Sequence, residues 1–292
     1  MNQWKKWKIK EISEDEAEFP TSLKKIPNCP EKLYYRGEWD SGLFLKTLGV
    51  VGSRRMTRYA VDVIAKFMPD LVANKVTIIS GFMYGVDSEA HKSCLELGGK
   101  TIAVLGSGLD FLTPTENDDL YTQILEKGGL VVSEYEPDFK PTLWSFPQRN
   151  RIVAGISTIG ILIVEAGIKS GSLITARLGI RQKKKIFAVP GLITSTASMG
   201  TNWLLQQNLA KIALSPAEIL GKPEDMEQMS FFDDNSISSE YKTILDVLRR
   251  EPMTIDELAR DIKKKIPETS ILISQMMMNL MVEDDGGKLY AL

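Results

Sequence analysis

Short runs of apolar, mostly β-branched residues recur along the middle of the chain and constrain its fold more than any other feature. Each run is followed by a turn containing Gly or Ser and then by a segment with helical periodicity. Apolar runs that do not alternate with polar residues are typical of strands buried on both faces of a parallel sheet. The runs lie at 48–51, 76–79, 102–105, 130–132, 159–164 and 186–189.

Helical periodicity fills the intervals between these runs, for example at 59–73, 87–97 and 119–127. Alternating strands and helices predict an α/β fold, namely an extended Rossmann-like, doubly wound and mostly parallel sheet over residues 41–220. Residues 1–40 contain three prolines among mixed charges and are predicted to form an N-terminal extension packed on this domain. Residues 221–240 are acidic and polar, which is typical of a linker.

The last part of the chain, residues 241–292, predicts a small separate domain. A helix is expected at 241–250, a second one after a capping box formed by Thr254 and Glu257, a third around 270–281, and a hairpin over 282–290. Three helices and a hairpin form the winged-helix plan. Because the third helix has no Lys or Arg between Ile271 and Leu280, contact with protein or packing is favoured over DNA reading.

Composition excludes several classes of protein. The 292 residues include only two cysteines and one histidine, so a disulfide scaffold or a zinc site is not expected. The sequence has no Gly-x-x-x-x-Gly-Lys-Ser/Thr loop, no secretory signal and no apolar run of about twenty residues. We expect a cytoplasmic protein without a metal or cofactor.

The distribution of charge is more informative than the formal net charge of −2. No Asp or Glu occurs between Glu165 and Glu218, whereas this stretch contains several Lys and Arg residues and a Ser170-Gly171-Ser172 turn. Positive charge is therefore concentrated in the α/β domain. This pattern predicts a surface that binds an extended polyanion, with single-stranded nucleic acid as the leading candidate.

Gly/Ser turns follow the predicted strands at their carboxyl ends, where a doubly wound sheet binds its ligands. Glycine lets backbone N–H groups approach an anion, serine adds a hydroxyl donor, and a following helix contributes its N-terminal partial charge. Any one of these turns also has a purely structural explanation. Five such turns follow the predicted strands: Gly52-Ser53-Arg54, Ser80-Gly81, Gly106-Ser107-Gly108, Ser170-Gly171-Ser172 and Pro190-Gly191.

A basic cluster, Arg149-Asn150-Arg151, follows Phe146-Pro147. Its two arginines could hold successive phosphates bidentately. The structural alternative is a helix start with an internal ion pair to Glu165 or Glu134. Lys169 joins the candidate site because of its charge and its position before Ser170.

An ordered set of motifs resembles the DprA/Smf family of bacterial DNA-processing proteins. The set spans nearly all of residues 45–215, and its FPxRNR and SGSxxTA pieces are highly specific. The matching segments are Val51-Gly52-Ser53-Arg54, Ser80-Gly81, Gly85-Val86-Asp87, Ala90-His91, Ala103 to Asp110, Ser133-Glu134, Phe146 to Ile152, Val164-Glu165-Ala166, Ser170 to Ala176, Val189-Pro190-Gly191 and Gly200-Thr201-Asn202.

The resemblance implies a dimeric protein that binds single-stranded DNA, protects incoming DNA during natural transformation and helps load the RecA recombinase. It implies no catalytic activity. The DNA-contacting positions that it implies are Gly52, Ser53, Arg54, Ser80, Gly81, Gly106, Ser107, Gly108, Arg149, Asn150, Arg151, Ser170, Gly171 and Ser172. One departure from the family pattern is Tyr84, where the family usually has Arg before the second Gly.

Two other classes of function remain open from the sequence. One is a nucleotide-processing enzyme, such as a phosphoribohydrolase on a related Rossmann-like fold. The loop at 170–179, which would correspond to its catalytic loop, has no carboxylate to act as acid or base. The other is a protein-interaction module whose pocket no longer binds a ligand, which requires the arginine cluster to be inert.

Overall fold

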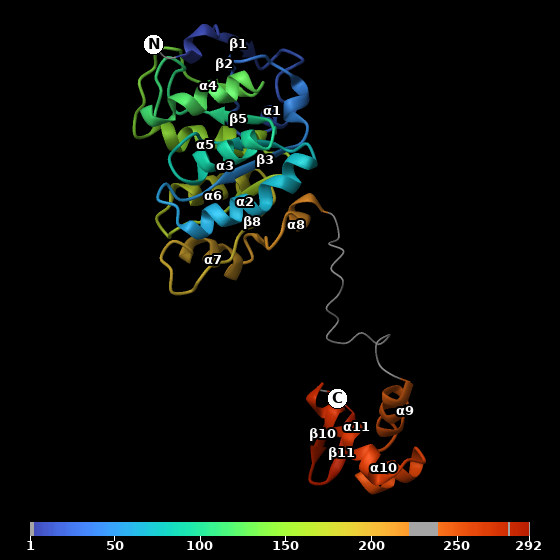
Figure 1. Ribbon diagram of the computed structural model, residues 1–292. Coiled ribbons are helices and arrows are strands. Elements are labelled where there is room, and N and C mark those ends of the chain that lie inside the picture. Colours follow the sequence, from blue (N-terminus) through green and yellow to red (C-terminus); the bar gives the residue numbers. More distant parts are fainter. Residues whose placement is uncertain (1–2, 222–238, 280, 292) are drawn as a thin grey trace. The chain divides into compact units, whose positions relative to one another are not determined.

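The computed structural model describes residues 3–221, 239–279 and 281–291, and the chain divides into two compact units, Met1–Glu224 and Asp225–Leu292 (Figure 1). The first unit contains a nine-stranded sheet in the order β1-β2-β6-β5-β4-β3-β7-β8-β9. The strands are β1 Lys10–Ser13, β2 Lys32–Arg36, β3 Thr47–Val51, β4 Thr77–Ser80, β5 Thr101–Val104, β6 Leu130–Ser133, β7 Gly160–Ile163, β8 Ile186–Ala188 and β9 Lys211–Ile212.

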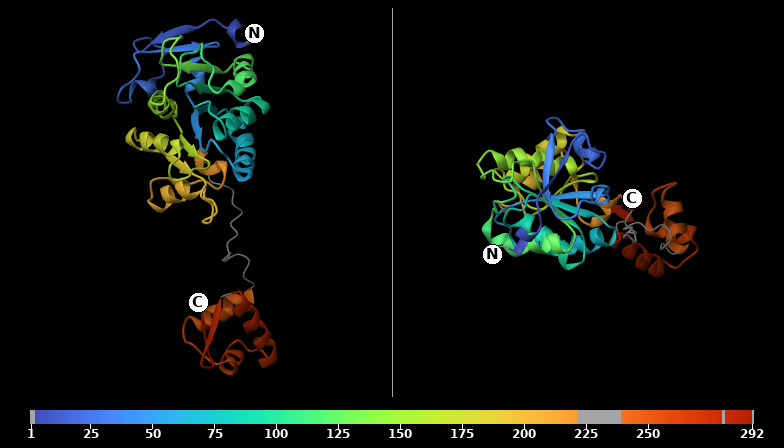
Figure 2. Two further views of the ribbon diagram at one scale, coloured as in Figure 1. Left: turned by 90° about the vertical axis from the view of Figure 1, so that its left-hand side faces the viewer. Right: turned by 90° about the horizontal axis from the view of Figure 1, so that it is seen from above.

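Helices cover both faces of this sheet, so the first unit has three layers, as Figure 2 shows in its left-hand view. One face packs on α2 (Arg58–Ala73), α3 (Val86–Glu96), α4 (Asp118–Glu126), α8 (Pro216–Leu220) and the short helix η1 (Gln3–Lys6). The other face packs on α1 (Thr21–Lys24), η2 (Ser41–Phe44), α5 (Ser145–Ile156), α6 (Gly171–Arg181) and α7 (Met199–Gln206). The short helix η3 spans Thr115–Asn117.

Strands β3 to β9 pair with one another only in parallel, which confirms the predicted doubly wound and mostly parallel fold. The central strands are buried on both faces: β3, β4, β5, β6, β7 and β8 contain only buried residues. This burial explains why their sequences do not alternate. Each apolar run predicted as a strand begins or ends within a few residues of the observed one.

The N-terminal segment is part of the sheet and does more than pack on it. Strand β2 pairs antiparallel with β6, and β1 pairs antiparallel with β2, so both extend the sheet at one edge. Trp4 is fully buried against Tyr121 of α4, and its indole N–H donates to Asp118 at 2.7 Å. These strands were not expected because the segment is short, rich in proline and mixed in charge.

The chain order places a topological switch point between β3 and β7. From β3 the strands proceed outward through β4, β5 and β6, and the chain then returns to β7 on the other side of β3. The loops after these two strands therefore diverge and leave a crevice between them at the carboxyl edge of the sheet. A crevice of this kind is where open α/β sheets bind ligands.

The second unit contains α9 (Ser239–Leu248), α10 (Ile255–Asp261), α11 (Ile266–Met278) and a hairpin of β10 (Val282–Asp285) and β11 (Lys288–Ala291). Ile244, Leu258, Met276 and Leu289 belong to its own small core. The predicted capping box is present, because Thr254 and Glu257 exchange side-chain and backbone hydrogen bonds at the start of α10. This element order agrees with the winged-helix plan, and the winged-helix assignment itself stays a prediction.

Across the described parts of both units, no helix combines the length and the apolar character needed to cross a membrane.

Candidate functional site

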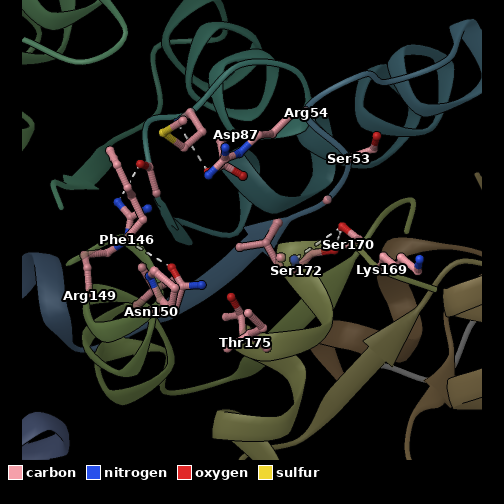
Figure 3. Close-up of a pocket in the computed structure, with 18 of the residues that line it drawn as sticks. Ser53, Arg54, Asp87, Phe146, Arg149, Asn150, Lys169, Ser170, Ser172 and Thr175 are labelled. Atoms are coloured by element: carbon pink, nitrogen blue, oxygen red, sulfur yellow. Dashed lines mark hydrogen bonds between the residues drawn. The ribbon is translucent and has the colours of Figure 1, made fainter. Parts of the chain in front are cut away.

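A cavity of about 580 Å³ occupies the switch point between β3 and β7 (Figure 3). The loops after β3, β4 and β7 and the first turns of α5 and α6 form its walls. We call it the switch-point pocket. Ten of the predicted site residues line it: Gly52, Ser53, Arg54, Gly81, Arg149, Asn150, Lys169, Ser170, Gly171 and Ser172.

Helix α6 begins at the pocket wall with the predicted serine turn. Ser170 is the N-cap, and its hydroxyl lies 2.7 Å from the hydroxyl of Ser172 and accepts a bond from the Ser172 N–H. A Cβ on Gly171 would meet open space, so this position leaves the backbone accessible from the pocket. The first turn of α6 contains no acidic residue. Free N–H groups and the helix dipole therefore favour an anion here.

Exposed cations lie at the rim of the pocket, among them Arg54 from the β3–α2 loop and Lys169 from the loop before α6. The Arg54 guanidinium lies 5.9 Å from the centre of the Phe146 ring. Within the described residues of the first unit, neither side chain forms a hydrogen bond or an ion pair. Figure 3 shows Arg54 and Lys169 on different sides of the pocket, so both can reach an anion that lies in it.

Arg149 lines the floor of the pocket and is almost fully buried, with 3% of its area exposed. Its Nη1 donates to the carbonyl of Gly81 at 2.6 Å and to the carbonyl of Val104, and its Nε donates to Asn150 at 3.1 Å. Burial lowers the pKa of Arg149 to about 10, although the nearby Asp87 carboxylate opposes the shift. Most N–H donors of Arg149 are thus used inside the protein, and its charge would act on a ligand mainly by electrostatic attraction.

Asp87 is the only carboxylate among the residues that line the switch-point pocket, and it is buried beside Arg149. Burial raises the pKa of Asp87, and the Arg149 charge partly opposes this effect. A Cβ on Gly81 would lie 2.7 Å from both Arg149 Nη2 and Asp87 Oδ2. Glycine at position 81 therefore permits the close approach of these two side chains beneath the pocket.

Arg151 points away from the switch-point pocket. It forms an ion pair with Glu134, and both side chains are mostly buried, at 11% and 12% exposure. Arg151 lines a neighbouring cavity of about 430 Å³ between α5 and α6. The structural alternative raised from the sequence, an internal ion pair to Glu134, is thus what the structure contains. Glu165 has a different partner, because it accepts hydrogen bonds from Thr57 N and Oγ1 at 3.0 and 2.6 Å.

The remaining predicted residues do not line the pocket and have local structural partners. The Ser80 hydroxyl donates to the Val50 carbonyl at 2.6 Å, and the Ser107 hydroxyl donates to the Phe111 carbonyl at 3.0 Å. Gly106 packs closely on Phe146, and Gly108 packs on the carbonyl groups of Glu136 and Pro137. The structure therefore brings together the turns after β3, β4 and β7, but not the turn after β5.

Among the polar residues of the pocket wall, Arg55 and Thr175 were not part of the predicted site. Thr175 follows Gly171 by four residues on α6, so helical spacing could have placed it on the same face. Tyr84, the departure from the family pattern, does not line the pocket, and its hydroxyl donates to Glu116 at 2.6 Å. His91 is buried, with Nδ1 2.5 Å from the Thr101 hydroxyl, and does not line the pocket either.

Comparison with known proteins places this geometry in a family. The family model described as DNA recombination-mediator protein A matches residues 10–223. The chain belongs to this family, known as DprA/Smf. Protein Smf of Escherichia coli strain K12 is 35% identical over 266 residues, which cover 88% of this chain and 70% of that protein. The DNA processing protein DprA of Streptococcus pneumoniae strain R6 is 38% identical over 206 residues, which cover 70% and 71%.

Solved structures of the family agree with the fold. An X-ray structure of DNA processing protein A from Streptococcus pneumoniae superposes with a TM-score of 0.68 at 36% identity, covering 75% of each chain. A structure of the Helicobacter pylori protein, described for its single-stranded DNA binding mode, superposes with a TM-score of 0.65 at 31% identity. This match covers 74% of this chain and 95% of the Helicobacter chain.

Proposed function

We propose that this protein binds single-stranded DNA in the switch-point pocket and acts in DNA processing. One observation carries the proposal. The pocket combines the open N-terminus of α6 with the exposed cations Arg54 and Lys169, and its only carboxylate, Asp87, is buried and paired in charge with Arg149. An arrangement of this kind attracts the phosphate backbone, because its lining has exposed positive charges and no exposed carboxylate.

The proposed contacts fall into two groups. Side chains and backbone N–H groups that reach the cavity would touch phosphates directly, and buried residues would shape the site or act through their charge. The first group comprises Gly52, Ser53, Arg54, Asn150, Lys169, Ser170, Gly171 and Ser172. The second comprises Ser80, Gly81, Gly106, Ser107, Gly108, Arg149 and Arg151.

The preference for a single strand rests on an aromatic side chain in the pocket wall and on one relative. A pocket between loops and two helix ends can take one flexible backbone, with Phe146 available to stack on an unpaired base. The Helicobacter pylori relative is described as a single-stranded DNA binder. Sequence-independent binding is expected, because phosphate contacts position a strand without reading its bases.

Family membership supports further parts of the proposal. We propose that the protein protects incoming single strands in natural transformation, helps load the RecA recombinase, and works as a homodimer in the cytoplasm without enzymatic activity. The C-terminal unit would contact protein more than DNA, since exposed residues of α11 include Ile271 and Met278 but no Lys or Arg.

Fluorescence anisotropy with a labelled oligothymidylate, titrated at several salt concentrations, tests this function. We expect tight, salt-sensitive binding of the single strand and weaker binding of the matching duplex. Arg54→Ala and Lys169→Ala should each reduce the slope of log K against log salt by about 0.7. Lys8→Ala and Lys92→Ala, which remove exposed lysines that do not line the pocket, serve as matched controls.

The nucleotide-processing enzyme is tested in the same titration by a mononucleotide arm. Binding of a mononucleotide with no affinity for the strand would contradict the DNA-binding proposal and favour the enzyme. Equal binding of the strand by the wild type, Arg54→Ala and Lys169→Ala would contradict the site.

A further inference from the structure

A second cavity with a strongly basic lining lies at the opposite, amino edge of the parallel sheet. It has a volume of about 430 Å³ and is formed where β3, β7, β8 and β9 begin and where α8 ends. We call it the lysine cavity. Five lysines line it: Lys46, Lys183, Lys184, Lys185 and Lys211. Because these strands are parallel, this cavity and the switch-point pocket lie at opposite ends of the strands.

Two of the five lysines have a structural role. The Lys46 ammonium donates to the carbonyl of Asn74, the residue that ends α2, at 3.0 Å. The Lys184 ammonium donates to the carbonyl of Gly155 near the end of α5 at 2.8 Å. Helices in this fold end at the amino edge of the sheet, so cations there offset the negative ends of helix dipoles. This explanation accounts for Lys46 and Lys184 only.

The other three lysines, Lys183, Lys185 and Lys211, have no such role. Their side chains are exposed, and within the described residues of the first unit none forms a hydrogen bond or an ion pair. The single carboxylate in the cavity lining, Glu218, is already bound to the Ser215 N–H and hydroxyl at 2.9 and 2.7 Å. Three unpaired ammonium groups around one hollow repel one another, and an anion in the hollow would relieve this repulsion.

The chemistry of the lining indicates the kind of anion. Lysine is a flexible point charge that holds phosphate without fixed geometry, whereas the switch-point pocket has arginine, serines and a helix N-terminus. The lysine cavity has no exposed aromatic side chain on which a base could stack. A ligand there would be held by its charges alone, as a phosphodiester backbone is.

We propose that the lysine cavity is a second contact for the phosphate backbone of a nucleic-acid single strand. A strand long enough to extend beyond the switch-point pocket reaches this cavity, and a short strand does not. The inference extends the proposed function. According to this inference, Lys183, Lys185 and Lys211 increase the affinity for long strands and leave the affinity for short strands unchanged.

The test compares two oligothymidylates, one of about six nucleotides and one of about 24, because a single site takes about 4–16 nucleotides. The triple variant Lys183→Gln/Lys185→Gln/Lys211→Gln should bind the short strand as the wild type does. For the long strand, its salt slope should fall by about 2, since each lost contact removes about 0.7. If the difference vanishes near about 1 M salt, this slope means roughly hundredfold weaker binding at about 0.1 M.

Two further variants control for net charge and for lysine itself. Lys8→Gln/Lys10→Gln/Lys92→Gln makes the same change in charge at exposed lysines that line neither cavity, and should leave the long-strand slope unchanged. Replacing Lys183, Lys185 and Lys211 by Arg keeps the charge and should keep the affinity. A Gln triple variant of the cavity that binds the long strand like its matched control overturns the inference.

Failure of this inference can be told apart from failure of the proposed function. Short-strand binding by the wild type reports the switch-point pocket, and the long-strand difference between the two Gln variants reports the lysine cavity. If the wild type does not bind the short strand, but the cavity Gln variant binds the long strand more weakly than its matched control, the result would support the cavity and contradict the pocket. If the cavity variant instead loses binding only to vesicles of anionic lipid, the ligand is a membrane surface and the inference is wrong.

Discussion

Replacement of Arg149 by Met should lower the free energy of unfolding of the first unit substantially, although the residue lies in a predicted binding motif. The change removes the donors for two carbonyl oxygens, those of Gly81 and Val104. An unsatisfied buried acceptor costs about 1–3 kcal/mol. Asp87 also loses the nearby Arg149 charge, which opposes the effect of burial on its pKa. Because Asp87 can take up a proton, the two carbonyl groups set the main cost, and we expect a total loss of about 2–6 kcal/mol.

Urea unfolding followed by tryptophan fluorescence measures this loss in the intact chain. All five tryptophans precede residue 225, so the signal reports the first unit alone. Arg54→Ala is the comparison, because Arg54 is exposed and its removal should change the free energy of unfolding by less than about 0.5 kcal/mol. The two substitutions should therefore have different effects: the one at Arg149 lowers stability, and the one at Arg54 weakens strand binding.

A double-mutant cycle shows whether Asp87 carries part of the effect. Asp87→Asn in the Arg149→Met background removes the uncompensated carboxylate, so the double variant should be less destabilised than the sum of the single variants. A coupling of about 0.5–3 kcal/mol is expected for groups in one network. An Arg149→Met protein that unfolds at the same urea concentration as Arg54→Ala would refute the assignment of Arg149 to the interior.

Two other outcomes follow from the structure. His91 is the only histidine, and burial lowers its pKa to about 3, so between about pH 6.5 and 3 the unfolded chain binds a proton that the folded chain does not. Wild-type stability should therefore fall as the pH falls through this window, and His91→Gln should lose less in the same urea titrations; parallel pH profiles would contradict this assignment. Deleting residues 241–292 should leave single-strand affinity within about threefold of the intact chain in anisotropy titrations, because the second unit has its own core. A larger loss would mean that the C-terminal unit binds DNA.

The local features of the fold could be predicted from the sequence. Unalternated apolar runs predicted the central strands, and the capping box at Thr254 and Glu257 predicted the start of α10, because both signals depend on neighbouring residues alone. The sequence also predicted that turns at the carboxyl edge of the sheet would carry the site, since carboxyl ends of parallel strands share one edge. The turns after β3, β4 and β7 do line the pocket, and the turn after β5 does not. Strands β1 and β2 were not predicted, because antiparallel edge strands of mixed charge show no clear periodicity in the sequence.

The roles of the basic residues were decided by tertiary structure. Arg149 and Arg151 lie two residues apart in one motif, yet one reaches backbone carbonyls beneath the pocket and the other reaches Glu134. Which partner each arginine finds depends on where β4, β5 and the chain after β6 pass, and local sequence patterns do not predict this. Likewise, Lys183, Lys185 and Lys211 meet only because β8 and β9 begin side by side.

The sequence by itself therefore determined the fold class, the family and the edge of the sheet that carries the candidate site, because these follow from local patterns and ordered motifs. Only the tertiary structure decided which cations face solvent and which stabilise the interior. The physical reason is that burial and hydrogen-bond partners depend on contacts between segments far apart in the chain. Arg54 and Arg149 have the same side chain, and their surroundings alone make one available to a ligand and the other part of the core.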